Sequence, residues 1–179
     1  MRNLFRARGS GEDPLRHLRA EKAWEKANRL YAQGRERRLE RPLRTAAELG
    51  HIEAMTNLGV VLHRKGRDRE AEQWWQRAAD RGSIESMYNL GNFYTKNGRD
   101  ADGRHWLTRA TDAGHLQAMS DLGVLLFENG QGAKARDLWT RAASRGSRSA
   151  AHNLQIFHVA DAALTKPPRV PGHHRPGGG

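Results

Sequence analysis

The stretch that decides the fold is AMTNLGVVLHRKGRDREAEQWWQRAADRG, residues 54–82. The same pattern returns twice, 32 residues further along each time, in residues 86–114 and 118–146. Each copy carries Leu-Gly, then a lone glycine, then Arg-Ala, and it closes on another glycine. A gapless internal repeat of this length predicts a solenoid built from one supersecondary unit.

Five series of residues share this 32-residue register, which makes a chance coincidence very improbable. They are Gly50, Gly82, Gly114 and Gly146; Gly66, Gly98 and Gly130; Leu58-Gly59, Leu90-Gly91 and Leu122-Gly123; Ala78, Ala110 and Ala142; and Met55, Met87 and Met119. The register therefore indicates three full repeats.

Each repeat is predicted to form two helices. Apolar residues in 51–65 recur at spacings of three and four, which places them on one helical face. Gly66 then supplies a left-handed stop, and a second helix over 68–81 ends at Gly82. The repeat unit is therefore an antiparallel helix pair.

Polar residues at the predicted helix starts are expected to cap them. Asp68 and Asp100 occupy equivalent places before the second helix of two repeats. Ser83 follows a closing glycine, and His51 and His115 hold the same register position. Because serine alternates with histidine there, we expect the imidazoles to cap helices rather than to bind a ligand.

A glycine inside the first helix of every repeat indicates a close approach by the second helix. Glycine costs about 1 kcal/mol against alanine in a helix, so its return needs a reason. Gly59 is expected to face the small side chains of Ala71 and Ala78. Trp75 is expected to be core and to fill the space between neighbouring repeats.

The ends of the array depart from the pattern. Residues 13–49 keep part of the register and are predicted to be a degenerate capping repeat, in which Pro42 breaks or delays the second helix. Residues 50–145 form the three helix-pair repeats, and residues 146–164 a C-terminal capping helix. Residues 1–12 are predicted to be a disordered basic N-terminus, and 165–179 a disordered proline- and glycine-rich tail.

The pattern Ala-x-x-x-Leu-Gly, then Gly, then Ala-x-x-Trp-x-x-Arg-Ala-Ala-x-x-Gly resembles the Sel1-like repeat, a close relative of the tetratricopeptide repeat. It is carried by residues 54–82, 86–114 and 118–146. The resemblance implies an all-α fold, a right-handed α-solenoid of antiparallel helix pairs with a 32-residue repeat. It also implies that the first helix of each pair lines a concave face.

The composition limits the classes of function that the protein can have. The 179 residues contain no cysteine, which excludes disulfides and thiolate sites, and no apolar run is long enough to span a bilayer. The net charge is +11, and residues 1–49 alone carry 13 basic and 7 acidic residues, a net of +6. Since no catalytic or phosphate-binding motif occurs, we expect no enzyme activity, no catalytic residues, no cofactor and no metal site.

The resemblance points instead to a protein or peptide partner on the concave face. The predicted partner-binding residues are Glu53, Asn57, Glu85, Tyr88, Asn89, Asn92, Gln117, Asp121 and Asn153, with Thr56 and Ser120 on the same face. Asn57, Asn89, Asp121 and Asn153 form a register ladder, which either binds ligand or braces adjacent repeats. Tyr88 is expected to be an exposed aromatic anchor.

The sequence therefore predicts a non-enzymatic protein–protein interaction adaptor in the cytoplasm, with a monomer favoured. The alternative is a nucleic-acid-associated protein that binds through its basic terminal segments, because phosphate binding needs clustered cations. Basic residues here lack interleaved exposed aromatics, which is unfavourable for single-stranded nucleic acid.

Overall fold

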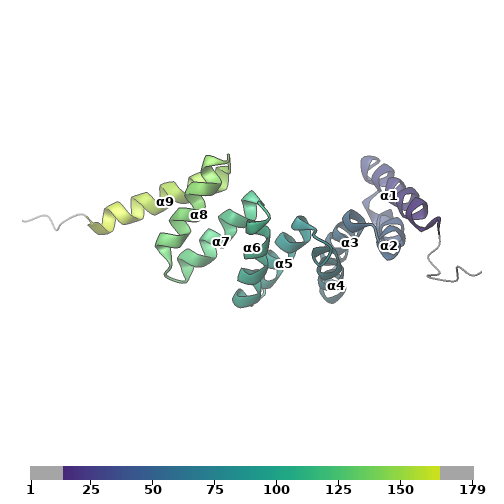
Figure 1. Ribbon diagram of the computed structural model, residues 1–179, viewed down its shortest axis with the longest axis horizontal. Helices are drawn as coiled ribbons and strands as arrows, with labels where there is room; N and C mark the ends of the chain where they lie inside the picture. The colour runs from purple at the N-terminus through teal and green to yellow at the C-terminus, as the bar shows by residue number, and fades with distance from the viewer. Residues whose placement is uncertain (1–13, 166–179) are drawn as a thin grey trace, which may run out of the picture. The chain divides into compact units, whose positions relative to one another are not determined.

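The computed structural model describes residues 14–165, with the side chains of residues 14–159. This part of the chain is helical throughout and contains no strand (Figure 1). The helices are α1 (Arg16–Ala32), a short 3-10 helix η1 (Glu36–Arg38), α2 (Glu40–Glu48), α3 (Ile52–Arg64), α4 (Asp68–Ala79), α5 (Ile84–Lys96), α6 (Asp100–Asp112), α7 (Leu116–Glu128), α8 (Gly132–Ser144) and α9 (Arg148–Thr165). The predicted disorder of residues 1–12 and 166–179 falls outside this description, whereas Thr165, predicted to begin the tail, is the last residue of α9.

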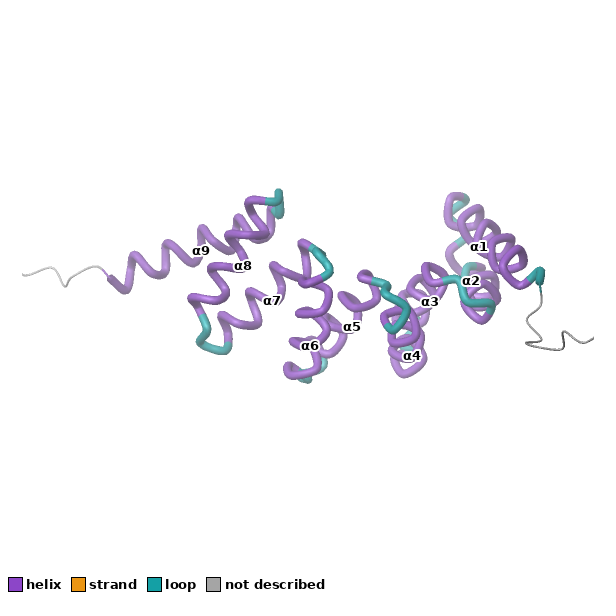
Figure 2. The backbone as a smooth tube through the Cα atoms, in the orientation of Figure 1, coloured by secondary structure: helices purple, strands orange, loops and turns teal. Residues whose placement is uncertain are grey.

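The chain divides into two compact units, 1–118 and 119–179. In the first, consecutive helices pack in sequence from α1 to α6. In the second, α8 packs against α9 and against the part of α7 that begins at Met119. Short loops join the helices (Figure 2). The predicted fold class is confirmed, since helix pairs repeat every 32 residues and strands are absent from the described range.

Glycines end the helices as predicted. Gly66 follows α3 with φ +74° and Gly82 follows α4 with φ +88°, a backbone region in which other residues are strained. The next backbone N–H in each case turns back to a helix carbonyl, as in Arg67 N to Leu62 O and Ser83 N to Ala78 O, both near 3 Å. These bonds satisfy carbonyls that the helix end leaves free.

The capping prediction is right for the first helices and wrong for the second. The side chains of His51 and Ser83 accept hydrogen bonds from the backbone N–H of Ala54 and Ser86. Before α4 and α6, however, Arg67 and Arg99 occupy the cap position and make no side-chain cap bond. The aspartates that follow are the first helical residues, where their charge favours the positive end of the helix dipole.

The partner of the helical glycine is an indole, not an alanine. A Cβ built on Gly59 would lie 2.5 Å from Cδ1 of Trp75 and still closer to its Nε1. Trp75 is buried and donates from Nε1 to the Thr56 carbonyl at 3.1 Å. Its ring also lies edge-on to Phe93 of the next repeat, with centroids 6.0 Å apart. The expectation that Ala71 and Ala78 face the glycine is therefore wrong.

The second unit repeats this arrangement with its own aromatic core. Trp139 of α8 donates to the Ser120 carbonyl of α7 at 2.9 Å, and Gly123 leaves room for the indole. Phe127 and Phe157 lie 5.9 and 6.2 Å from the Trp139 ring centroid. Trp139 therefore joins three helices, because α9 supplies Phe157.

The first helix pair is the irregular one. α2 begins only at Glu40 and has 9 residues, against 12 in α4, with η1 before it. Pro42 is the third residue of α2, in the first turn, where its missing N–H has no helical partner to lose. The late start predicted from Pro42 is confirmed, whereas the capping role of residues 13–49 stays a prediction.

Candidate interaction surface

The predicted partner-binding residues lie on the first helices of the repeats. On α3, α5 and α7 the exposed ones are Glu53, Asn57, Glu85 and Gln117, and the half-buried ones are Tyr88, Asn89, Asn92 and Asp121, with Asn153 half-buried on α9. In the first unit we call the exposed sides of α1, α3 and α5 the first-helix face. Asp121 and Asn153 belong to the second unit.

Two members of the predicted face are buried. Thr56 Oγ1 lies 3.0 Å from Ser83 Oγ and 2.8 Å from Ser86 Oγ, so it bonds α3 to the start of α5. Ser120 is fully buried on α7. These hydroxyls therefore stabilise packing and do not line a surface, which corrects the sequence interpretation.

Tyr88 is half-buried and does not offer the exposed anchor that the sequence predicted. Its ring stacks on His115 with centroids 4.4 Å apart and planes 23° apart. His115 also caps α7 through Ala118 N at 3.0 Å, and its Nε2 lies 3.4 Å from Glu85 Oε1. Tyr88 and Glu85 therefore hold a helix start in place.

The same kind of contact occurs two helix pairs earlier. Trp24 of α1 stacks on His51 with centroids 4.7 Å apart, and Glu21 Oε1 lies 3.6 Å from His51 Nε2. Trp24 and Tyr88 are 64 residues apart, with Thr56 at the position between them. Aromatic–histidine and hydroxyl–hydroxyl contacts thus alternate at this position within the first unit.

At Asn153, the structure supports the alternative in which a ladder residue braces adjacent repeats. Its Nδ2 donates to Ser120 Oγ at 3.4 Å, which ties α9 to α7. Asn57 is different, because it is exposed and lines a cavity of about 460 Å³. The ladder positions therefore differ in their surroundings.

This cavity lies between α1, α2 and α3 of the first unit. Its lining is mainly apolar with a few polar groups, namely Trp24, Ala27, Asn28, Tyr31, Leu39, Leu43, Asn57, Val60, Val61 and Arg64. Tyr31 is 66% exposed, which is high for a tyrosine beside an apolar cavity. An apolar pocket with a few convergent polar groups is the usual form of a ligand site.

Sequence reasoning identified Asn57 in this cavity but missed the aromatic residues. Trp24 and Tyr31 lie seven residues apart, two helical turns, and so share one side of α1. Each also falls on the 32-residue register, at the positions of Thr56 and His63. That extension of the register was the signal that would have found them.

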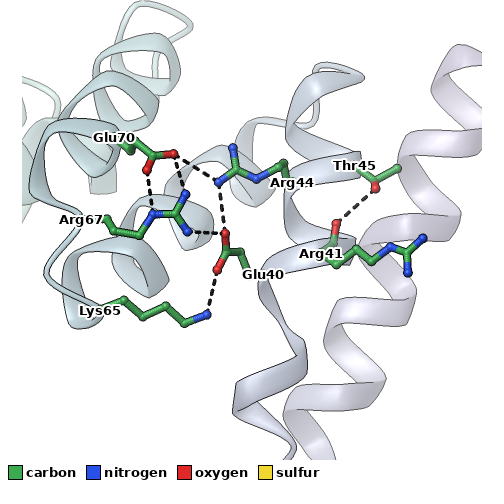
Figure 3. A network of polar contacts seen from close by, with 7 residues as sticks. All are labelled: Glu40, Arg41, Arg44, Thr45, Lys65, Arg67 and Glu70. Carbon is green, nitrogen blue, oxygen red and sulfur yellow. Dashed lines mark hydrogen bonds and ion pairs between the residues drawn. The ribbon is translucent and has the colours of Figure 1, made fainter.

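A network of charged side chains joins the first helix pair, α1 and α2, to the second pair, α3 and α4 (Figure 3). Glu40 of α2 accepts from Lys65 Nζ at 2.7 Å, from Arg67 Nη1 at 2.6 Å and from Arg44 Nη2 at 3.2 Å. Arg67 and Arg44 also bond Glu70 of α4. The network therefore links α2 to the loop before α4 and to α4 itself.

These three cations lower the pKa of Glu40 from 4.5 to about 2, and the Lys65 hydrogen bond has the largest effect. Because the folded pKa is lower than the unfolded one, Glu40 stabilises the fold fully above about pH 4.5. That stabilisation is lost as the pH falls from 4.5 towards 2.

Replacing Glu40 with glutamine tests this dependence. Glu40→Gln is expected to lower the free energy of unfolding by about 1 kcal/mol at neutral pH, because three cations lose a shared carboxylate near the surface. The difference from wild type should shrink as the pH falls from about 5 to about 3. Urea unfolding followed by circular dichroism measures it, with Glu128→Gln on an exposed carboxylate of α7 as the control. A difference that is constant over this pH range would contradict the assignment.

Among the residues that the structure describes, no three histidine, aspartate or glutamate side chains come together in a way that could hold a metal ion. In the same part of the chain, no helix combines the length and the apolar character that crossing a membrane requires.

Three segments match known repeats. Residues 51–82 match the tetratricopeptide repeat, and residues 84–115 and 116–147 each match the Sel1 repeat. Together these matches cover more than half of the chain. No curated protein matches the sequence.

Solved structures share the fold. A protective antigen of uropathogenic Escherichia coli that displays an SLR fold is 23% identical, with a TM-score of 0.63 over 69% of this chain and 29% of its own. This chain thus spans less than a third of the antigen. PilF of Pseudomonas aeruginosa is 17% identical, with a TM-score of 0.69 over 83% of this chain and 71% of its own.

A third structure is YrrB, a tetratricopeptide repeat protein whose reported feature is an unusual peptide-binding site. It is 20% identical, with a TM-score of 0.61 over 80% of this chain and 78% of its own. At these identities the likeness concerns the fold. The repeat matches over residues 51–147, together with the 32-residue helix pairs, show that the chain belongs to the Sel1-like and tetratricopeptide repeat proteins.

Proposed function

We propose that this protein is a non-enzymatic scaffold that binds a partner protein through an extended segment on the first-helix face. Tetratricopeptide and Sel1 repeats generally form protein–protein interaction scaffolds. The observation that carries the proposal is the cavity of about 460 Å³ between α1, α2 and α3. YrrB, with its peptide-binding site, is a precedent in the same fold.

The chemistry of the cavity suits a peptide. The half-buried Val60 and Val61 offer apolar surface for one bulky side chain, and Tyr31 stands exposed at the same site. The side-chain amide of Asn57 both donates and accepts, so it suits a peptide backbone. The other exposed predicted residues of the first unit, Glu53, Glu85 and Gln117, extend the proposed contact surface.

Affinity capture with matched variants tests this function. Wild type is expected to retain a small set of proteins from a nuclease-treated lysate, and Tyr31→Ala with Asn57→Ala should lose that set while helicity stays unchanged. The control is Gln73→Ala with Arg69→Ala, which alters exposed residues of α4. Mass spectrometry reads the retained proteins. Equal capture by wild type and by the Tyr31 and Asn57 double variant would contradict the proposal, and so would a set that nuclease removes.

The cytoplasmic location and the monomeric state expected from the sequence stay predictions. Of the basic terminal segments of the nucleic-acid alternative, residues 1–13 and 166–179 lie outside the described residues, and binding through these segments stays a prediction.

A further inference from the structure

A surface next to the charged network carries cations that the network does not use. A second cavity, of about 430 Å³, is lined by Arg37, Arg38, Glu40, Arg41, Arg44, Thr45, Glu48 and Lys65. Five of these eight side chains are cationic and two are carboxylates. The cavity lies on η1 and α2, apart from the cavity that Asn57 lines.

Three of these arginines form no ion pair with any of the described residues. Glu40 is shared by Lys65, Arg67 and Arg44, as described above. Arg37, Arg38 and Arg41 are exposed and have no carboxylate partner among the described residues. In Figure 3 the side chain of Arg41 points away from Glu40 and the network.

This accumulation of charge is confined to the first helix pair. Positions 37, 38, 41 and 44 are all arginine. One register later the residues are Arg69, Glu70, Gln73 and Gln76, then Ala101, Asp102, His105 and Thr108, then Ala133, Lys134, Asp137 and Thr140. A solvated helix surface alone does not require four arginines where the other repeats carry mixed or neutral residues.

We propose that Arg37, Arg38, Arg41 and Arg44, called here the α2 basic surface, bind an acidic peptide segment of a partner protein. The three unpaired guanidiniums and Arg44 lie within two helical turns, a span on the order of 10 Å. An extended peptide covers that distance with about three residues, so closely spaced Asp or Glu side chains reach several guanidiniums at once. Guanidinium pairs with carboxylate in a planar, bidentate geometry.

The lining favours an acidic peptide over nucleic acid. Glu40 and Glu48 also line the cavity, and their charge opposes a continuous phosphate backbone, whereas a peptide places its carboxylates only where cations stand. The lining contains no aromatic ring on which a base can stack. The α2 basic surface would be a second, electrostatic contact site, separate from the first-helix face. Binding to it does not depend on the cavity between α1, α2 and α3.

Binding of a labelled acidic peptide to the full chain tests the proposal. The probe is a ten-residue fluorescein peptide of glutamate and aspartate with glycine spacers, followed by fluorescence anisotropy. Wild type should bind it, and more weakly as NaCl rises from about 50 to about 200 mM. Arg37→Glu, Arg38→Glu and Arg41→Glu together should reduce affinity at least about tenfold. The control, Arg69→Glu, Arg136→Glu and Arg148→Glu, makes the same change in net charge and should retain affinity within about threefold.

Three results would overturn the proposal. Wild type fails to bind the peptide, both triple variants lose affinity equally, or a single-stranded oligonucleotide of equal charge binds more tightly through the same three arginines. If the glutamate variant loses helicity, the Arg37→Gln, Arg38→Gln and Arg41→Gln variant answers the same question with a smaller loss. Tyr31→Ala with Asn57→Ala should leave peptide binding unchanged, so failure here is distinct from failure of the first-helix face.

Discussion

Replacing Gly59 with alanine is expected to lower the free energy of unfolding by about 2 kcal/mol, although alanine is the better helix former by about 1 kcal/mol. The added methyl would lie 2.5 Å from Cδ1 of Trp75, well inside van der Waals contact. Trp75 is 3% exposed, and its Nε1 is bonded to the Thr56 carbonyl. The indole therefore has to move, and moving it breaks that bond.

A double-mutant cycle with Trp75→Ala separates this clash from a general effect on α3. In the Trp75→Ala background the same glycine substitution should cost nothing or stabilise the protein, because the new methyl meets a void and the helix propensity gain remains. Urea unfolding followed by circular dichroism gives all four free energies. Equal effects of Gly59→Ala in both backgrounds would show that the indole is not its partner.

Replacing Trp139 with alanine should lower the free energy of unfolding by about 3–5 kcal/mol, the largest change expected in this protein. Trp139 is buried among α7, α8 and α9, against Phe127 and Phe157. Its loss leaves a cavity and removes the hydrogen bond from the indole to the Ser120 carbonyl. Because repeat units contact only their neighbours, we expect hydrogen exchange to accelerate most in residues 119–159.

Trp139→Phe is the matched control, since it keeps an aromatic ring and removes the hydrogen bond and part of the volume. Trp139→Phe should lower the free energy of unfolding by about 1–3 kcal/mol, less than Trp139→Ala. Leu138→Ala also removes a buried side chain of α8 but breaks no hydrogen bond to Ser120. If Trp139→Ala destabilised the protein by under about 1 kcal/mol, the three-helix role of the indole would be contradicted.

Much of the fold can be predicted from the sequence because the same 32-residue pattern occurs three times. The register gave the helix pairs, the positive-φ glycines such as Gly66, and the caps at His51 and Ser83. What it did not determine was the contact of Gly59. Periodicity shows that a second helix approaches, but the crossing of the two helices decides whether an alanine or the indole of Trp75 meets the glycine.

The surface was less predictable, because it depends on contacts between residues far apart in sequence. Tyr88 has the register of a surface position, yet His115, 27 residues later, stacks on it. Asp68 was misplaced by one residue, because a helix start depends on local backbone geometry that composition does not resolve. Glu40 pairs with Lys65 and Arg67, which lie 25 and 27 residues later in the sequence. Such a pairing depends on how the helices pack and cannot be read from the sequence.

The most direct test of the scaffold account is site-specific photocrosslinking on the first-helix face. p-Benzoylphenylalanine in place of Tyr31 puts a reactive aromatic ketone at an exposed aromatic position of the cavity, and the same residue in place of Gln73 reports on the exposed side of α4. We predict a discrete crosslinked partner from position 31, resistant to nuclease, and none from position 73. Crosslinking from position 73 alone, or equally from both positions, would contradict the account.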